Sequence, residues 1–172
     1  MIGRSNVGKS SLINALTRQR VARTSAAPGK TRLANVFRVV RGASPPFYLV
    51  DLPGYGYARG GASAAAEFEQ LTYDYFARTG HDGGAPVSGI LLIDSRHDAM
   101  ASDRAAWQWL MAAVPGHALV ATKIDKLARG ARIRALRALE SVYEHPVLPV
   151  SAVTGEGLDE LWKLIDRLAN SR

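Results

Sequence analysis

The stretch that decides the fold reads Gly3-Arg4-Ser5-Asn6-Val7-Gly8-Lys9-Ser10. This is the pattern G-x-x-x-x-G-K-[ST] of a phosphate-binding loop, in which backbone N–H groups surround a diphosphate and the lysine reaches the outer phosphates. The serine hydroxyl ligates Mg²⁺, which prefers oxygen ligands. The apolar run from Ser11 onward predicts a helix whose N-terminal dipole faces the anion. We therefore expect all of residues 3–11 to bind nucleotide, Lys9 to contribute to catalysis and Ser10 to bind the metal.

The rest of the chain alternates between apolar runs and amphipathic patterns, which predicts an α/β fold. Apolar residues at i, i+3, i+4 and i+7 predict helices around Trp107 and Trp162, with both tryptophans in the core and Ser102 or Asp103 capping the first helix. Nearly continuous apolar runs predict a mostly parallel sheet, and the turn-rich link at 41–46 predicts an antiparallel pair before it. The expected strands are residues 33–40, 47–51, 90–94, 118–122 and 147–150.

One strand of this fold is hard to find in the sequence. A phosphate-binding loop follows a buried strand, yet only Met1 and Ile2 precede Gly3. A missing central strand would leave its neighbours with unpaired backbone groups, which are costly. We expect the first strand to be truncated, and the alternative is that another segment fills its place.

Composition sets the class of protein. The chain has 172 residues, 47% of them hydrophobic, which suits a single domain over residues 1–172 with its own core. It has no cysteine, which excludes disulfides and cysteine-ligated metal sites. No apolar run has the roughly 20 residues of a transmembrane helix, and we expect a cytoplasmic monomer. The formal net charge of +7 favours an acidic partner, of which nucleic acid is the commonest large one.

A second nucleotide-site element follows the expected strand at 47–51. It reads Asp51-Leu52-Pro53-Gly54, and we expect all four residues to lie at the nucleotide. A carboxylate at the strand end can accept a hydrogen bond from a magnesium-bound water. The Gly54 N–H can approach a γ-phosphate because no Cβ obstructs it, so we assign Gly54 to catalysis.

A third element predicts guanine as the base. It reads Thr122-Lys123-Ile124-Asp125. The Asp125 carboxylate can accept two hydrogen bonds, from the guanine N1–H and the exocyclic amine, and adenine lacks that pair of donors, which disfavours an ATPase. The Lys123 stem can lie across the base plane. Backbone N–H groups near the next expected strand end would meet the guanine oxygen, and the residues concerned are Val150, Ser151 and Ala152.

Between the first two elements lies a segment that the Pro28-Gly29 dipeptide marks as a loop. A threonine there can complete the magnesium shell when the γ-phosphate is present, and Thr31 is favoured over Thr24 because it lies next to the strand. The loop would then be ordered by GTP and released after hydrolysis. The residues expected at the nucleotide are Gly29, Lys30, Thr31, Arg32 and Leu33, with Thr31 also assigned to metal binding and catalysis.

Together these segments resemble the EngB (YihA/YsxC) family of bacterial phosphate-loop GTPases. The resemblance rests on GRSNVGKSSLIN, PGKTR, DLPGYGYA, TKID and the late Ser-Ala pair, and it covers essentially the whole chain. It implies a Ras-like three-layer α/β/α domain that converts GTP to GDP and phosphate. It also implies a role in assembling the large ribosomal subunit and in normal division septation. In similar GTPases an asparagine at the position of Asn6 ligates K⁺.

The sequence leaves the hydrolytic step open. Ras-like enzymes place a glutamine after the D-x-x-G glycine to orient the attacking water, whereas this chain has Tyr55, so we expect slow intrinsic hydrolysis. No arginine finger can be chosen among Arg4, Arg23 and Arg32. The alternative is a nucleotide-gated binding module with negligible hydrolysis. A GTPase of transfer-RNA modification is a weaker reading, because the chain has no cysteine and no room for an extra catalytic domain.

Basic residues gather in two places that suit contact with phosphates. The first precedes the Pro-Gly loop, at Arg18, Arg20 and Arg23, and the second is expected on one helix, at Lys126, Arg129, Arg132, Arg134 and Arg137. For any single arginine, a solvated helix face is the better explanation. We also expect Asp94 and Arg96 to form a structural pair, and the four histidines show no metal-ligand spacing (His81, His97, His117 and His145).

Overall fold

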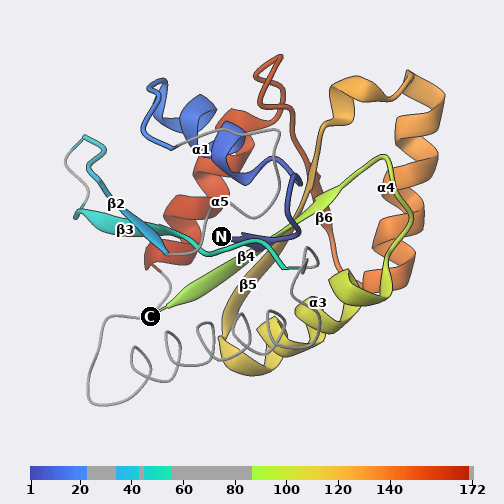
Figure 1. The fold of residues 1–172 in the computed structure, drawn as a ribbon, viewed down its shortest axis with the longest axis horizontal. Coiled ribbons are helices and arrows are strands. Elements are labelled where there is room, and N and C mark those ends of the chain that lie inside the picture. The colour runs from blue at the N-terminus through green and yellow to red at the C-terminus, as the bar shows by residue number, and fades with distance from the viewer. Residues whose placement is uncertain (23–33, 43–44, 56–86, 171–172) are drawn as a thin grey trace.

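The computed structural model describes residues 1–22, 34–42, 45–55 and 87–170. A four-stranded parallel sheet forms its centre, in the order β1 (Ile2–Gly3), β4 (Ser88–Asp94), β5 (Gly116–Thr122) and β6 (Val147–Pro149) (Figure 1). A separate antiparallel pair, β2 (Asn35–Val39) and β3 (Phe47–Asp51), lies between β1 and β4 in the chain. The α/β fold with its mostly parallel sheet and antiparallel pair is therefore confirmed.

The first strand is short, but its place in the sheet is filled. Ile2 and Gly3 pair in parallel with Leu91 and Leu92 of β4. On the other edge the Met1 amine donates to the Val50 carbonyl at 2.5 Å. The Leu52 N–H donates to the Met1 carbonyl at 3.2 Å, so backbone hydrogen bonds also join β1 to the end of β3. No other described segment takes this slot, and the phosphate-binding loop begins directly at the end of β1.

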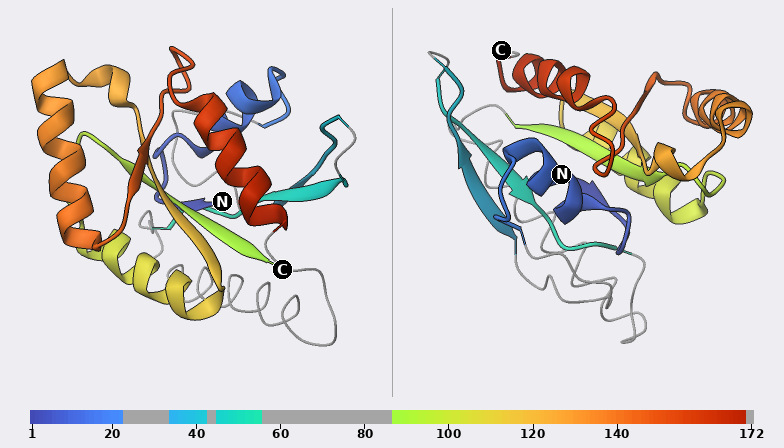
Figure 2. Two further views of the ribbon diagram at one scale, coloured as in Figure 1. Left: turned by 180° about the vertical axis from the view of Figure 1, so that it is seen from behind. Right: turned by 90° about the horizontal axis from the view of Figure 1, so that it is seen from above.

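The helices cover both faces of the sheet. They are α1 (Lys9–Thr17), α3 (Ala101–Ala113), α4 (Arg129–Tyr143) and α5 (Leu158–Asn170), and in the rear view of Figure 2 α5 crosses the strands. Ile90 and Leu92 pack with the apolar sides of α1 and α5. Leu91 and Ile93 point the other way and pack with α3 and α4. This alternation along β4 produces the three layers, because successive side chains of a strand face opposite sides.

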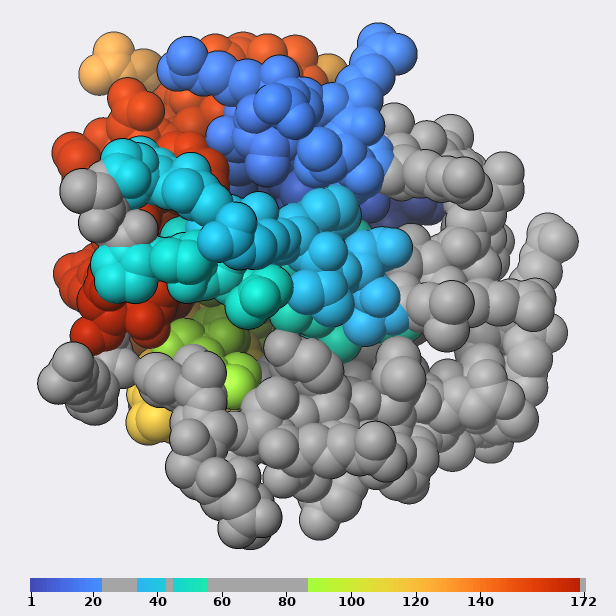
Figure 3. All heavy atoms as spheres, turned by 90° about the vertical axis from the view of Figure 1, so that its left-hand side faces the viewer, coloured from blue at the N-terminus to red at the C-terminus, as the bar shows by residue number. Residues whose placement is uncertain are grey.

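The β2–β3 pair lies across the same side of the molecule as α1 and α5 (Figure 3). The Arg41 guanidinium, just after β2, lies 4.2 Å from the centre of the Trp162 ring on α5. It also forms an ion pair with Asp166 at 2.6 Å. This contact fixes the hairpin to the last helix. Both tryptophans pack into the core as predicted, Trp107 with 2% of its surface exposed and Trp162 partly buried against the core.

Two local predictions are wrong. Helix α3 begins after Met100, with no side-chain cap, so neither Ser102 nor Asp103 caps it. Lys126 lies in a separate 3-10 turn, η1 (Ile124–Lys126), and only the arginines of the expected basic set belong to α4. No helix in the described ranges is long and apolar enough to cross a membrane.

Candidate functional site

The phosphate-binding loop has the geometry of an anion site. Gly8 is the N-cap of α1 with a φ of 105°, and Asn6 also has a positive φ, 63°. A side chain at Gly8 would be strained, since L-residues rarely adopt this conformation. No side chain caps α1, and the first N–H groups of a helix have no intrahelical acceptor. They and the helix dipole are therefore directed at the place a phosphate would take.

Two buried side chains of opposite charge, Lys9 and Asp51, belong to this site. Lys9 is 8% exposed and its ammonium donates to the Gly3 carbonyl at 3.2 Å. Burial lowers the pKa of Lys9, and the nearby Asp51 carboxylate partly offsets the effect. Asp51 is 1% exposed, and burial raises its pKa while Lys9 opposes the rise. Among the described residues Asp51 Oδ1 has no hydrogen-bond partner, so this buried oxygen is left to accept one from a ligand.

Gly54 brings the D-x-x-G segment into contact with the phosphate-binding loop. A Cβ at Gly54 would lie 2.7 Å from Ser5 N and 2.9 Å from Ser5 Cα, closer than backbone atoms tolerate. The Ser5 N–H donates to the carbonyl of the next residue, Tyr55, at 3.1 Å. Only glycine allows this approach, so the two segments expected at the phosphates do meet.

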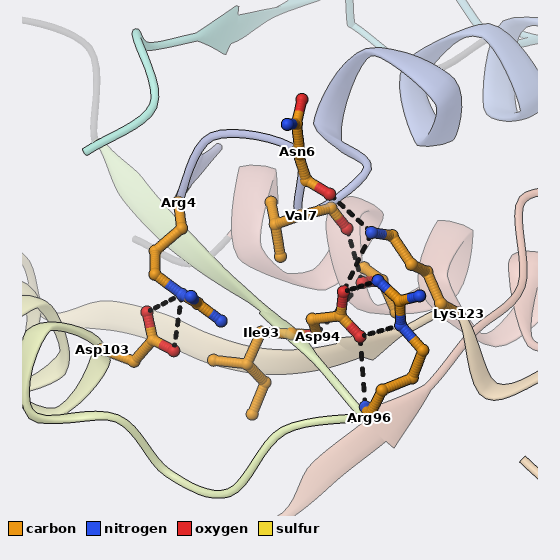
Figure 4. A network of polar contacts seen from close by, with 9 residues as sticks. Arg4, Asn6, Val7, Ile93, Asp94, Arg96, Asp103 and Lys123 are labelled. Atoms are coloured by element: carbon orange, nitrogen blue, oxygen red, sulfur yellow. Dashed lines mark hydrogen bonds and ion pairs between the residues drawn. The ribbon is translucent and has the colours of Figure 1, made fainter. Parts of the chain in front are cut away.

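The Tyr55 side chain is buried and directed at α3. Its hydroxyl donates to Asp103 Oδ1 on α3 at 2.9 Å, and burial, together with the Asp103 charge, raises the pKa of Tyr55. Arg4, from the phosphate-binding loop, forms an ion pair with the same carboxylate at 3.1 Å (Figure 4). Asp103 thus joins two segments of the nucleotide site to α3. This role was not predictable from the sequence, because an acidic residue in a first helical turn resembles a cap.

Residues 122–125, the expected base-recognition segment, are held in place by hydrogen bonds to neighbouring groups. Asp125 Oδ1 accepts a hydrogen bond from the Ser151 hydroxyl at 2.7 Å, and this bond lowers the pKa of Asp125. The Thr122 hydroxyl lies 2.7 Å from the Val7 carbonyl and 3.1 Å from the Ile93 carbonyl, so it ties the end of β5 to the phosphate-binding loop. Thr122 is 4% exposed, and its side chain contacts other parts of the protein.

Some predicted site residues serve the fold. The side chains of Leu52, Ile124 and Val150 are at most 1% exposed and lie in the core. The Ser151 N–H donates to the Glu156 carbonyl at 2.9 Å, so it is engaged within the protein. The predicted loop residues Gly29, Lys30, Thr31, Arg32 and Leu33 lie outside the described residues, as does the alternative Thr24.

Four of the remaining predicted residues lie at or just beyond the carboxyl ends of strands. Gly3, Asp51 and Thr122 end or follow directly on β1, β3 and β5, and Ser151 comes just after β6. The carboxyl ends of the strands are where open α/β sheets bind ligands. The Asp94–Arg96 pair at the end of β4 is confirmed, with Arg96 Nη2 2.8 Å from Asp94 Oδ2.

Two histidines that are far apart in the sequence meet at the opposite end of β5. The rings of His117 and His145 lie 5.2 Å and 4.9 Å from Trp107, centre to centre, and 5.8 Å from each other. Within the described ranges no three potential metal ligands come together. This cluster packs side chains together and takes no part in the nucleotide site.

Comparison with known proteins agrees with this geometry. A family described as "50S ribosome-binding GTPase" matches residues 1–123. The probable GTP-binding protein EngB of Thermosipho africanus is 36% identical over 167 residues, 96% of this chain and 82% of the relative. A crystal structure of a probable GTP-binding protein EngB has a TM-score of 0.72 at 19% identity and covers 99% of this chain and 97% of that one.

A second structure extends the likeness of fold. It is Era in complex with MgGDPNP and nucleotides of 16S ribosomal RNA, with a TM-score of 0.79 at 21% identity, covering 99% of this chain and 56% of Era. At this identity the likeness concerns the fold alone. The family match and the EngB relative carry the assignment, because each covers most of the chain. The chain belongs to the EngB family of GTP-binding proteins within the ribosome-binding GTPases.

Proposed function

We propose that this protein binds GTP with Mg²⁺, hydrolyses it slowly, and uses the two nucleotide states to assist assembly of the large ribosomal subunit. The observation that carries the nucleotide part is the meeting of three segments at one sheet edge. Gly54 touches Ser5 of the phosphate-binding loop, and Thr122 bonds to Val7 of the same loop. The phosphates and the base would therefore be bound by segments that already contact one another.

The residues at the phosphates suit a magnesium ion. Asp51 offers a buried oxygen with no protein partner among the described residues, and Ser10 offers a hydroxyl at the start of α1. We assign both to the metal, Asp51 through a water, and Thr31 as the third group when GTP is bound. Bound Mg²⁺ would neutralise phosphate charge. The protein's own contribution is Lys9 and the loop N–H groups, which stabilise charge on the transferred phosphoryl group, with Gly54 N–H at the γ-phosphate.

On the base side, we assign the guanine N1–H and amine to Asp125. The Ser151 hydroxyl holds this carboxylate in place from behind. Because the Ser151 N–H is engaged by Glu156, we assign the guanine oxygen to the Ala152 N–H alone. Lys123 would lie along the base plane.

Potassium should accelerate hydrolysis if Asn6 ligates it. Asn6 is exposed, and its side chain points away from the Lys123 and Asp94 groups in Figure 4. A cation beside the phosphates would supply charge that no assigned arginine provides. We expect single-turnover hydrolysis to be faster in potassium than in sodium at matched ionic strength, and Asn6→Ala to remove the difference. Equal rates of the unchanged protein in both salts would contradict the assignment.

A binding module without useful hydrolysis is the second candidate, and the position of Tyr55 favours it. With its hydroxyl on Asp103, the Tyr55 side chain is directed at α3. Water would then have to be positioned by backbone or by a partner. Single-turnover hydrolysis separates the two candidates, since a measurable rate in the isolated protein excludes the binding module.

Tyr55→Phe should lower stability and leave hydrolysis unchanged. The substitution removes a hydrogen bond to a buried carboxylate, a loss of about 1–3 kcal/mol in the free energy of unfolding. Denaturant unfolding and single-turnover hydrolysis would measure the two effects. Tyr48→Phe is the matched control, because Tyr48 is 66% exposed on β3 and should change neither. A tenfold drop in the rate for Tyr55→Phe alone would show that the tyrosine hydroxyl acts in hydrolysis.

The ribosomal part of the proposal rests on the family and on charge. The family's description names the 50S ribosome, and the chain carries a formal charge of +7. Arg129, Arg134 and Arg137 are exposed on α4, where they can bridge to RNA phosphates. We further propose a cytoplasmic monomer and, following the family resemblance, a contribution to normal division septation.

Co-sedimentation with purified large ribosomal subunits tests the ribosomal part. We expect the protein to pellet with the particles when loaded with a non-hydrolysable GTP analogue, and to stay in the supernatant with GDP. Arg134→Glu combined with Arg137→Glu should weaken pelleting, whereas Asp159→Asn on α5 should not. The same pelleting with GTP analogue and GDP would contradict a nucleotide-controlled attachment.

A further inference from the structure

The Asp94 carboxylate, at the end of β4, accepts hydrogen bonds from two cationic side chains. Asp94 is 5% exposed. Its Oδ1 accepts hydrogen bonds from Arg96 N at 3.1 Å and Arg96 Nε at 2.9 Å. Its Oδ2 accepts from Arg96 Nη2 at 2.8 Å and from Lys123 Nζ at 2.9 Å (Figure 4). Burial alone would raise the pKa of Asp94, but these hydrogen bonds hold it well below its usual range, so the group is ionised at neutral pH.

The Lys123 ammonium lies between this carboxylate and the phosphate-binding loop. Besides Asp94, it donates to the Asn6 carbonyl at 2.5 Å. The Lys123 stem runs past the same loop, since a Cβ on Gly8 would lie 3.7 Å from Lys123 Cε. Lys123 therefore spans three segments, namely the end of β4, the end of β5 and the phosphate-binding loop.

This placement of Lys123 needs support. The Lys123 backbone is left-handed, with a φ of 60°, a conformation that non-glycine residues rarely adopt. A lysine side chain is also flexible, and much of that freedom is lost when it is fixed. A carbonyl alone is a neutral acceptor, whereas a buried carboxylate gives a stronger, charge-assisted bond. Asp94 supplies the charge that keeps the ammonium on Asn6.

We propose that Asp94 is a positioning residue for the guanine nucleotide, which fixes Lys123 as the surface on which the base lies and joins the base-recognition segment to the phosphate-binding loop. The inference rests on the proposed nucleotide site and deepens it. Asp94 acts through Lys123 and not by contact with the base. It should therefore affect every purine base that lies on the Lys123 stem, and leave the reading of the guanine amine to Asp125.

Titration of GDP and inosine diphosphate tests the proposal. In Asp94→Asn the amide cannot hold the ammonium as a carboxylate does, so the dissociation constant of GDP should rise about tenfold, the effect of one charged hydrogen bond. The ratio of the two nucleotides' dissociation constants should stay the same, because inosine lacks only the amine that Asp125 reads. A changed ratio would mean that Asp94 acts through Asp125 and would overturn the proposal.

A double-mutant cycle shows whether Asp94 acts through Lys123. Lys123→Met keeps the apolar stem but removes the ammonium, and GDP should again bind about tenfold more weakly, with little further loss when Asp94→Asn is added. The proposal would be overturned if the two substitutions weakened GDP binding by independent factors that multiply in the double variant. It would also be overturned if Lys123→Met bound GDP as tightly as the unchanged protein. The second result is decisive even if Asp94→Asn fails to fold.

Arg96→Ala is the control for a purely structural role. It removes the two guanidinium hydrogen bonds from Asp94 and leaves the bond to Lys123, so GDP affinity should stay within about twofold. If Arg96→Ala weakened GDP binding as much as Asp94→Asn does, Asp94 would act by holding the loop around Arg96 and not by holding Lys123. Failure of the unchanged protein to bind GDP would instead contradict the proposed function itself.

Discussion

Asp125→Asn is expected to weaken GDP binding by about a hundredfold or more and to let xanthosine diphosphate bind in its place. The carboxylate can accept from both the N1–H and the exocyclic amine of guanine. An asparagine offers one acceptor and one donor, so one of the two guanine donors loses its partner. The amide hydrogens of the asparagine then face the guanine amine. Two hydrogen bonds to a charged group change together, and each such bond contributes about 1.5–3 kcal/mol to binding.

Xanthine matches the new side chain. It keeps the N1–H but carries a carbonyl oxygen where guanine has the amine, so an asparagine can accept from the first and donate to the second. The Ser151 hydroxyl can still donate to an amide oxygen, which preserves the contact that positions the side chain. Competition of GDP and xanthosine diphosphate for the site would measure the change. Asp159→Asn, at an exposed position of α5, is the matched control. Unchanged preference for GDP would show that another group reads the base.

Lys9→Met is expected to have the largest effect on hydrolysis. The ammonium is the only described cation that lies within the phosphate-binding loop and is nearly buried, at 8% exposure. Removing one such group from a preorganised charged site costs a factor of about 100 to 1,000 in rate. GTP binding should also weaken at least tenfold, roughly the loss of one charged hydrogen bond.

The state of Asp51 changes with this substitution. Burial already raises the pKa of Asp51, and the Lys9 charge is the largest effect that opposes the rise. Without it, the pKa of Asp51 should rise further and its proton should compete with magnesium. Single-turnover hydrolysis at several magnesium concentrations measures both consequences. Lys163→Met, an exposed lysine on α5, is the control. Near-normal hydrolysis by Lys9→Met would refute the phosphate site described above.

Elements with a strong local pattern could be predicted from the sequence. β4 and β5 are continuous apolar runs because both faces of each strand are covered by helices. The nucleotide segments were recognisable because each depends on its own residue types, such as Gly8 and Lys9 in one loop. The structure adds that these segments touch, through Gly54 on Ser5 and Thr122 on Val7.

Features that depend on distant partners could not be predicted. β1 has two residues and no periodicity, and its existence depends on pairing with β4 and on backbone bonds to the end of β3. The sequence pattern predicts Ser102 or Asp103 as a helix cap, but the partners of Asp103 lie 48 and 99 positions earlier in the chain. For Asp94 the local bond to Arg96 was predictable, whereas the bond to Lys123, 29 residues later, was not. A sequence pattern reports the local preference, and tertiary contacts decide these roles.

Thermal unfolding with magnesium and GDP, compared with magnesium and ADP, tests the central claim of a guanine-specific site most directly. A ligand at 100 times its dissociation constant adds about 2.7 kcal/mol of stability, which is readily visible as a higher midpoint. We predict a clear rise with GDP and none with ADP, and loss of the GDP effect in Asp125→Asn. Equal shifts with both nucleotides, or no shift with GDP, would contradict a guanine-specific site.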